Sequence, residues 1–265
     1  MTGVDPGYVG LALGFGALIG LSLGALGAGG SILTVPILVY AMGVAVPVAA
    51  GTSLAIVGAS AALGAADHLR RGRALPKTGV AFGVSGVAGA FAGAWLNHQL
   101  RGELVLVLFS VLMLGAAVSL VRRRAAGITE DVFSEDYAPT QWVRLAVVGT
   151  VVGFLTGFFG VGGGFLIVPA LVLVVGLPMH LAVGTSLLAI ALNALWGVLG
   201  HVRLGGLDWG LTGLFVAGGA LGVAAGGRLA PLVPEARLRQ AFALLIVAVA
   251  LYTFARSAAG LAGMM

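Results

Sequence analysis

The sequence predicts an all-α membrane protein with eight to ten transmembrane segments, arranged as two homologous repeats that each contain a glycine-rich broken helix. Three observations predict this class. Hydrophobic residues fill 60% of the 265 positions and charged residues only 9%, with a mean hydropathy of +1.11. Apolar stretches of about 20 residues, the length that crosses a bilayer, recur along the chain. The two halves of the chain also carry the same motif at the same spacing.

Eight apolar stretches are long enough to cross roughly 30 Å of hydrocarbon. They lie at about 8–28, 48–66, 78–98, 104–121, 142–159, 179–200, 209–228 and 238–255. Two shorter stretches, 31–46 and 164–177, follow the glycine-rich segments and contain Pro36 and Pro169. As helices of about 14 to 16 residues they extend roughly 21 to 24 Å, so they either cross thinly or stop partway.

The repeat aligns residues 20–72 with residues 153–205 at a constant offset of 133. Each copy has a glycine-rich break, then a proline and a Gly-Thr-Ser triplet. Interrupted hydrophobic segments at equivalent places in two halves indicate a transporter's binding site. The expected organisation is a first repeat at 1–121, a cytoplasmic linker at 122–141 and a second repeat at 142–265. The matched residues are Gly27, Gly29, Gly30, Pro36, Gly51, Thr52 and Ser53, and Gly160, Gly162, Gly163, Pro169, Gly184, Thr185 and Ser186.

We compare two topologies by how many Lys and Arg residues each of them places on the inner side of the membrane. If both short segments cross, each half has five spans and the repeats are inverted, with 11 basic residues inside and 3 outside. If neither crosses, the repeats are parallel and the numbers are 10 and 4. We favour inverted repeats, because they bring two broken helices together near the midplane from opposite sides. The basic residues lie in short loops, so the net charge of +5 reports topology, and we expect no nucleic-acid partner.

We expect the glycine breaks to bind a small anion. Glycine inside a helix costs about 1 kcal/mol relative to alanine, and unwound backbone is tolerated in a membrane only beside protein or water. A break frees N–H groups at the start of the next half-helix, where the helix dipole favours negative charge. The alternative is that the glycines only let two helices cross tightly. The candidate positions are Gly27, Gly29, Gly30 and Ser31, and Gly160, Gly162, Gly163 and Gly164.

Polar residues downstream of each break are the next candidates for substrate contact. The hydroxyl groups of Thr52, Ser53, Thr185 and Ser186 lie about 20 residues after the breaks and would complete the hydrogen bonds of an oxoanion. Alternatively, they cap the helix or bond back to its own carbonyls. Asn193, which matches Ser60 of the first copy, is an uncharged donor on the same segment as Thr185. All nine acidic residues lie in loops or at span ends, so a cation would find no counter-charge in the membrane.

Two further repeated features have more ordinary explanations. His68 and His201 correspond at the same offset and are candidates for gating or proton coupling, with anchoring at the membrane interface as the alternative. Small residues three or four apart predict close helix packing at Gly86, Gly89 and Gly93, and at Gly219, Gly222 and Gly226. With no Cys and four scattered His, we expect no metal site and no cofactor.

The doubled motif resembles a known family. G-A-G-G-S-I-L-T-V-P followed by A-G-T-S-L, and G-V-G-G-G-F-L-I-V-P followed by V-G-T-S-L, are similar to the two signature stretches of the TauE/SafE family of sulfite-exporter-type permeases. The resemblance covers roughly residues 10–255. It implies a multipass protein of the plasma membrane, the cell inner membrane, that moves small anions such as sulfite, sulfoacetate and related organosulfur compounds. The first break has Ser31 where the second has Gly164.

These inferences together predict a secondary transporter for a small oxoanion or sulfonate that works by alternating access. Its other expected partners are the lipid bilayer and a coupling ion, proton or sodium, while the oligomeric state is left open. One alternative is a passive anion channel that uses the same site. A membrane-embedded enzyme or an assembly subunit is another. Without Cys, buried carboxylates or clustered His an enzyme would have few catalytic groups, so we expect no enzymatic activity.

Overall fold

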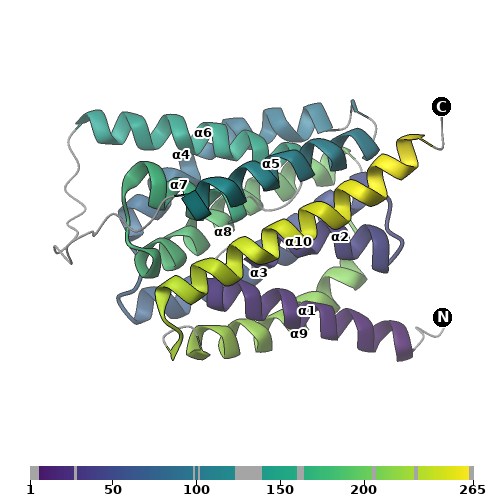
Figure 1. The fold of residues 1–265 in the computed structure, drawn as a ribbon, viewed down its shortest axis with the longest axis horizontal. Helices are drawn as coiled ribbons and strands as arrows, with labels where there is room; N and C mark the ends of the chain where they lie inside the picture. The colour runs from purple at the N-terminus through teal and green to yellow at the C-terminus, as the bar shows by residue number, and fades with distance from the viewer. Residues whose placement is uncertain are drawn as a thin grey trace.

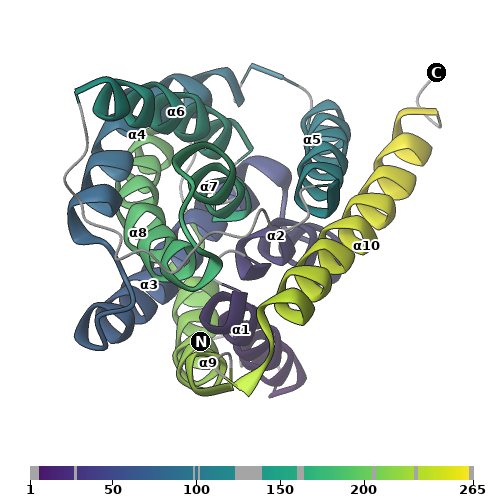
Figure 2. The same cartoon turned by 60° about the vertical axis from the view of Figure 1, so that its left-hand side comes forward.

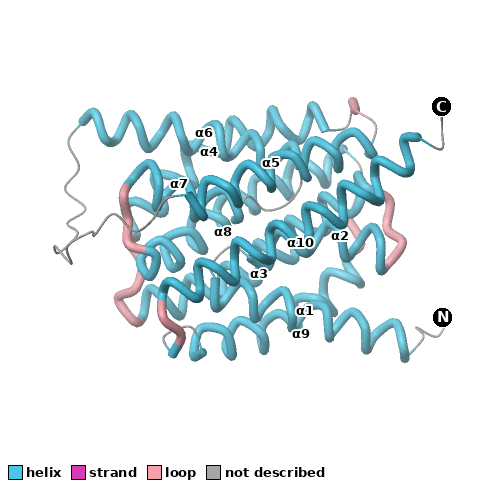
Figure 3. Tube along the Cα trace, in the orientation of Figure 1, coloured by secondary structure: helices cyan, strands magenta, loops and turns pink. Residues whose placement is uncertain are grey.

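Every regular element that the structure describes is a helix (Figure 1 and Figure 3). The structure, a computed structural model, describes residues 6–26, 29–97, 99–100, 102–122, 139–159, 164–204, 207–229 and 232–262. The long helices are α1 (Pro6–Leu26), α3 (Val46–Arg70), α4 (Pro76–Asn97), α5 (Gly102–Arg122), α6 (Pro139–Phe159), α8 (Met179–Leu204), α9 (Trp209–Leu229) and α10 (Glu235–Ala262). The short elements are α2 (Gly29–Pro36), η1 (Ile37–Ala41), α7 (Gly164–Ala170) and η2 (Leu171–Val175).

Six of the long helices, α1, α3, α4, α6, α8 and α9, are long and apolar enough to cross a membrane. The other two crossings expected from the sequence fall on α5 and α10, whose described apolar parts, Gly102–Gly115 and Ala243–Arg256, are shorter. The protein is therefore a multipass membrane protein. Most of the predicted linker, 123–138, lies outside the described residues, and α6 begins at Pro139.

The helix bounds repeat along the chain at the offset of the motif. Helix α1 starts at Pro6 and α6 at Pro139, which is 133 residues later. The same shift relates the start of α3 at Val46 to that of α8 at Met179, and α4 at Pro76 to α9 at Trp209. Each glycine-rich segment therefore occupies an equivalent place between a long helix and a short one.

The two short helices change to a π-helix at their prolines. Pro36 is the last residue of α2 and Pro169 the last but one of α7. Proline has no N–H to donate to the i−4 carbonyl, so the regular ladder is interrupted there, and the wider π turns η1 and η2 follow. Both segments stop soon after, at 41 and 175, and are shorter than the predicted 14 to 16 residues. Gly43 and Gly176, at φ of 69° and 84°, take the left-handed backbone conformation that these turns require.

Close glycine contacts join α1 to α9 and α4 to α6. A Cβ atom at Gly20 would collide with the carbonyl of Gly219, and one at Gly153 with the carbonyl of Gly86. These positions allow two helix backbones to touch, as the sequence predicted. The same close approach occurs at Gly89 and Gly93 towards α6, and at Gly222 and Gly226 towards α1.

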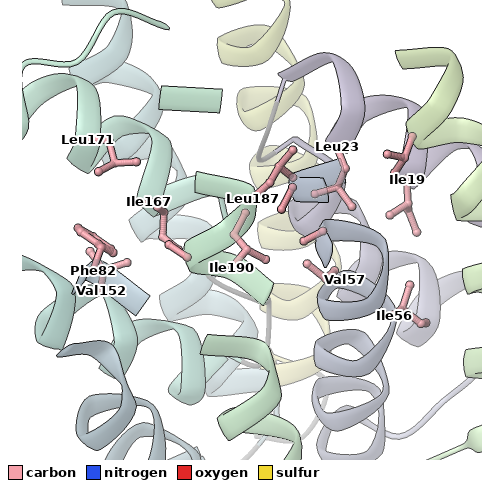
Figure 4. Close-up of a cluster of buried hydrophobic side chains, with 14 of the residues drawn as sticks. Ile19, Leu23, Ile56, Val57, Phe82, Val152, Ile167, Leu171, Leu187 and Ile190 are labelled. Carbon is pink, nitrogen blue, oxygen red and sulfur yellow. The ribbon is translucent and has the colours of Figure 1, made fainter. Parts of the chain in front are cut away.

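The centre of the molecule is the pair α3 and α8, which correspond in the repeat and run antiparallel. Gly64 lies against Leu187, and Gly197 lies against Leu54. Helix α9 packs on α3, and α4 packs on α8. Apolar side chains from both central helices, Val57 among them, meet those of α1, α4 and α6 in the core (Figure 4). Helices α5 and α10 pack on one another at one side of the bundle (Figure 2).

Candidate functional site

The segments that follow the two glycine breaks lie side by side in the bundle. Helix α2 contacts α7, and they pack on α3 and α8 respectively. Ile32 of α2 and Val168 of α7 are fully buried in one apolar cluster. The structure therefore brings the two half-helices that follow the glycine-rich segments into contact. Of the break residues, Gly27, Gly160, Gly162 and Gly163 lie outside the described part of the chain.

The described end of the first break is tightly packed. Gly29 is the first residue of α2, and a Cβ at Gly30 would collide with the carbonyl of Ile19 in α1. Ser31 is fully buried, and Thr34 Oγ1 donates to the Gly30 carbonyl at 3.0 Å. The packing of α1 accounts for a glycine at position 30. Gly164 is the buried first residue of α7.

The threonines of the two Gly-Thr-Ser triplets accept equivalent hydrogen bonds from the opposite half. The N–H of Leu75 donates to Thr185 Oγ1 at 3.0 Å, and the N–H of Asp208 donates to Thr52 Oγ1 at 3.2 Å. Leu75 and Asp208 are themselves 133 residues apart and immediately precede α4 and α9. Helix capping by these threonines, the alternative considered from the sequence, is wrong, because Thr52 and Thr185 lie inside α3 and α8. Each hydroxyl group still has a hydrogen to donate.

The triplet serines differ from each other. Ser186 Oγ donates to the Val183 carbonyl at 2.8 Å, the local bond that the sequence offered as an alternative. Ser53 Oγ is buried without a hydrogen-bond partner. The serine hydroxyl group of the first triplet is therefore buried without a partner. The serine hydroxyl group of the second triplet is bonded within α8.

The most unusual polar group is the side chain of Asn193, halfway along α8. It is 0% exposed, and neither Nδ2 nor Oδ1 has a hydrogen-bond partner. The side chain lies directly on Gly86 of α4. Its counterpart Ser60 is also fully buried, with an unpartnered Oγ that lies against Gly219 of α9. Buried polar groups are nearly always hydrogen-bonded, so two equivalent exceptions in the central helices need an explanation.

Ser60 was not among the residues predicted to bind substrate. The only sequence signal for it is its alignment with Asn193, which marks a polar position in both copies of an otherwise apolar helix. Its burial and its missing partner required the packing of α3 against α9 to be known.

The two histidines lie near the ends of the central helices. His68 is in the last turn of α3, 7% exposed, and neither ring nitrogen has a hydrogen-bond partner. Its Cβ lies beside Gly184 at the start of α8. This burial does not fit the anchoring role considered as an alternative. His201 is in α8, but its side chain is outside the described part of the structure. Because α3 and α8 are antiparallel, the two histidines are not brought together.

Acidic groups within the described residues lie in terminal helical turns or in loops. Asp67, Glu103 and Glu235 are in terminal turns, and Asp208 precedes α9, where its Oδ1 accepts from the N–H of Leu211 at 2.9 Å. Among the described residues no group of three His, Asp or Glu side chains is placed to hold a metal ion. The unpartnered groups of α3 and α8, apart from His68, are therefore neutral hydroxyl and amide groups.

Comparison with known proteins assigns the chain to a family. The family model described as sulfite exporter TauE/SafE matches residues 12–253. A "Probable membrane transporter protein" of Xylella fastidiosa (strain 9a5c) is 36% identical over 254 residues, covering 95% of this chain and 97% of the relative. "Probable membrane transporter protein YdhB" of Bacillus subtilis (strain 168) is 29% identical over 232 residues, covering 86% and 92%.

No solved structure matches the chain. The family match extends over both copies of the motif and over the helices that hold Asn193 and Ser60. With its apolar helices and doubled glycine motif, the chain belongs to the sulfite exporter TauE/SafE family of membrane transporters.

Proposed function

We propose that the protein moves a small anion, such as sulfite, a sulfonate or a related organosulfur oxoanion, across the cell inner membrane by alternating access. The observation that carries the proposal is Asn193, a fully buried amide with no partner in the middle of a membrane helix. Leaving such a group unpaired costs about 1–3 kcal/mol. A substrate oxygen that accepts from Nδ2 would remove part of that cost.

The proposed binding region lies along the α3–α8 pair, beside the short helices α2 and α7. Three kinds of donor would serve an oxoanion there: the N–H groups at the glycine breaks, the hydroxyl groups of Ser31, Thr52, Ser53 and Thr185, and the Asn193 amide. Ser186 would join them only by releasing the Val183 carbonyl to which its hydroxyl group donates. The first N–H groups of a helix have no partner within the helix, and the helix dipole favours an anion beside them. The absence of charged side chains along α3 and α8 between their ends supports a site that recognises an anion by neutral donors.

An inverted relation between the two halves is part of the proposal. Equivalent helices α3 and α8 run antiparallel, which supports it. Figure 1 adds support, because α1 begins near the N-terminus at the right of the view and α6 begins at the left. In inverted repeats the two halves exchange conformations when the site changes the side from which it is open. We further propose that a proton or sodium ion couples transport, with His68 and His201 as candidate gating or coupling groups.

The test is flux into proteoliposomes that contain the purified full-length protein. Labelled sulfite and short sulfonates should enter saturably, and entry should accelerate when the vesicles are preloaded with the same unlabelled anion. Flux that does not saturate, with large single-channel currents, would indicate a passive channel instead. If folded protein moves none of these anions, the proposed substrate class is wrong.

A further inference from the structure

An open groove runs between the first short segment and α10, on the outside of the bundle. It has a volume of about 320 Å³. Its walls are almost wholly apolar, with Leu33 and Ile37 on one side, Ala248 and Val249 on the other, and Tyr40 and Tyr252 also lining it. The neighbouring face of α10 is exposed and apolar, with Leu244 at 71% and Leu251 at 55%. In a membrane protein this face meets lipid.

Aromatic rings and a cation lie together beside this groove. The rings of Tyr40 and Tyr252 meet edge to face, with centroids 5.6 Å apart and planes at 89°. The guanidinium carbon of Arg256 lies 5.6 Å from the centroid of Tyr40. Arg256 is exposed, one turn beyond Tyr252, and forms no ion pair within the described residues. Stacking uses the flat face of the guanidinium, so its N–H edge remains available to an anion.

We propose that this groove binds an anionic phospholipid, with one acyl chain between η1 and α10 and the phosphate on Arg256. Three features fit one molecule of this kind. The apolar walls match an acyl chain, the tyrosines belong at the level of the glycerol and headgroup, and the arginine complements a phosphate. A headgroup with net negative charge is favoured over a zwitterionic one, because Arg256 is a cation and has no ion-pair partner among the residues that the structure describes.

The lipid site lies against the short segment that follows the first glycine break, and the second break has no equivalent aromatic pair. Tyr40 and Tyr252 correspond in the repeat to Leu173 and Ser119, so the aromatic pair has no counterpart in the other copy. The groove wall η1 continues directly from α2, the helix that follows the first glycine break. A bound lipid would therefore contact the segment that follows the first glycine break and not the equivalent segment of the second half. The lipid site itself does not depend on which anion is transported.

The experiment measures lipid retention by native mass spectrometry of the full-length protein, released from micelles that contain equal amounts of phosphatidylglycerol and phosphatidylcholine. The wild type should retain phosphatidylglycerol preferentially. Arg256→Gln should lower that preference about tenfold, the size expected for the loss of one charge-assisted hydrogen bond. Ala248→Trp, at an exposed position, should fill the groove and reduce retention of both lipids. The matched controls are Arg228→Gln at the exposed end of α9 and Ala241→Trp at another exposed position of α10.

The result that would overturn the proposal is equal retention of the two lipids by the wild type, or an unchanged preference in Arg256→Gln. A third arm adds inorganic phosphate. Displacement of the lipid by millimolar phosphate, together with full retention in Ala248→Trp, would show a simple anion site and contradict the acyl-chain groove. The two variants alter different parts of the site, so a folding defect in one leaves the other as the test. Lipid retention is measured without flux, so its outcome is separate from that of the transport assay.

Discussion

The backbone N–H of Leu75 donates to Thr185 Oγ1 at 3.0 Å, across 110 residues of sequence. The bond connects the loop before α4 in the first half to the start of α8 in the second. Its repeat counterpart, from the N–H of Asp208 to Thr52 Oγ1, connects the second half to the first. The repeated triplets therefore supply a pair of reciprocal bonds that join the halves, in addition to any contact with substrate.

Removing one of these acceptors should destabilise the protein. Thr185→Val keeps the shape of the side chain but leaves the Leu75 N–H without its acceptor, and we expect unfolding to become easier by about 1 kcal/mol or more. Thr185→Ser should retain most of the stability. The measurement is the unfolding temperature in detergent. Thr156→Val is the matched control, because the Thr156 hydroxyl group donates only to the Val152 carbonyl of its own helix. Equal losses in the two valine variants would contradict the cross-half role.

The glycine seams make a second prediction about folding. Gly20→Val should destabilise α1 against α9 strongly, because its Cβ would collide with the Gly219 carbonyl and neither backbone can yield. Inserting extra atoms into a packed interior typically costs about 1–3 kcal/mol, and more where the backbone must move. Gly14→Val, on the open face of the same helix, has nothing within 4 Å of its Cβ and should be tolerated. The yield of monodisperse protein after gel filtration compares the two, and equal yields would rule out a close crossing.

The sequence predicted the helices well but not their partners. Hydropathy places the long helices within about four residues of their observed bounds, because membrane crossing dominates the composition of these segments. The exception is the end of α10, which lies at Ala262, seven residues beyond the predicted end. The spacing of Gly86, Gly89 and Gly93 predicts a close helix contact, but nothing in it names α6 as the neighbour. The sequence likewise does not predict that α1 packs against α9, since small residues fit any helix of suitable shape.

The surroundings of the candidate site residues could be predicted from the sequence only in part, for a physical reason. The glycine-rich segments and the triplets are local patterns, so the sequence itself displays both. The role of Thr52 and Thr185 as acceptors depends on loops more than 100 residues away, which no local pattern reveals. Likewise, Ser60 resembles any small residue of a membrane helix until α9 is placed against it.

Asn193 should matter to transport and not to stability. Asn193→Leu replaces an unpartnered buried amide with an apolar group of similar size, so the free energy of unfolding should be unchanged or higher. Flux of the transported anion should fall roughly tenfold or more, because one hydrogen bond to a charged substrate is lost. Ser60→Ala is the matched change in the other copy. A fall in unfolding temperature without a change in flux would make Asn193 a packing residue, held against Gly86 for structural reasons.

Close helix packing and anion binding, the two explanations of the first glycine break, predict different results for substitutions at the adjacent residues Gly29 and Gly30. Gly30→Ala should impair folding, because its Cβ would meet the carbonyl of Ile19 in α1. If the breaks form the anion site, Gly29→Leu and the equivalent Gly162→Leu should instead abolish flux while insertion and gel-filtration behaviour stay normal. The side chain would then cover the N–H groups at the start of the half-helix, where an anion is favoured. Loss of folded protein in both leucine variants would show that close packing explains the whole glycine motif, and the donors for the anion would have to come from α3 and α8 alone.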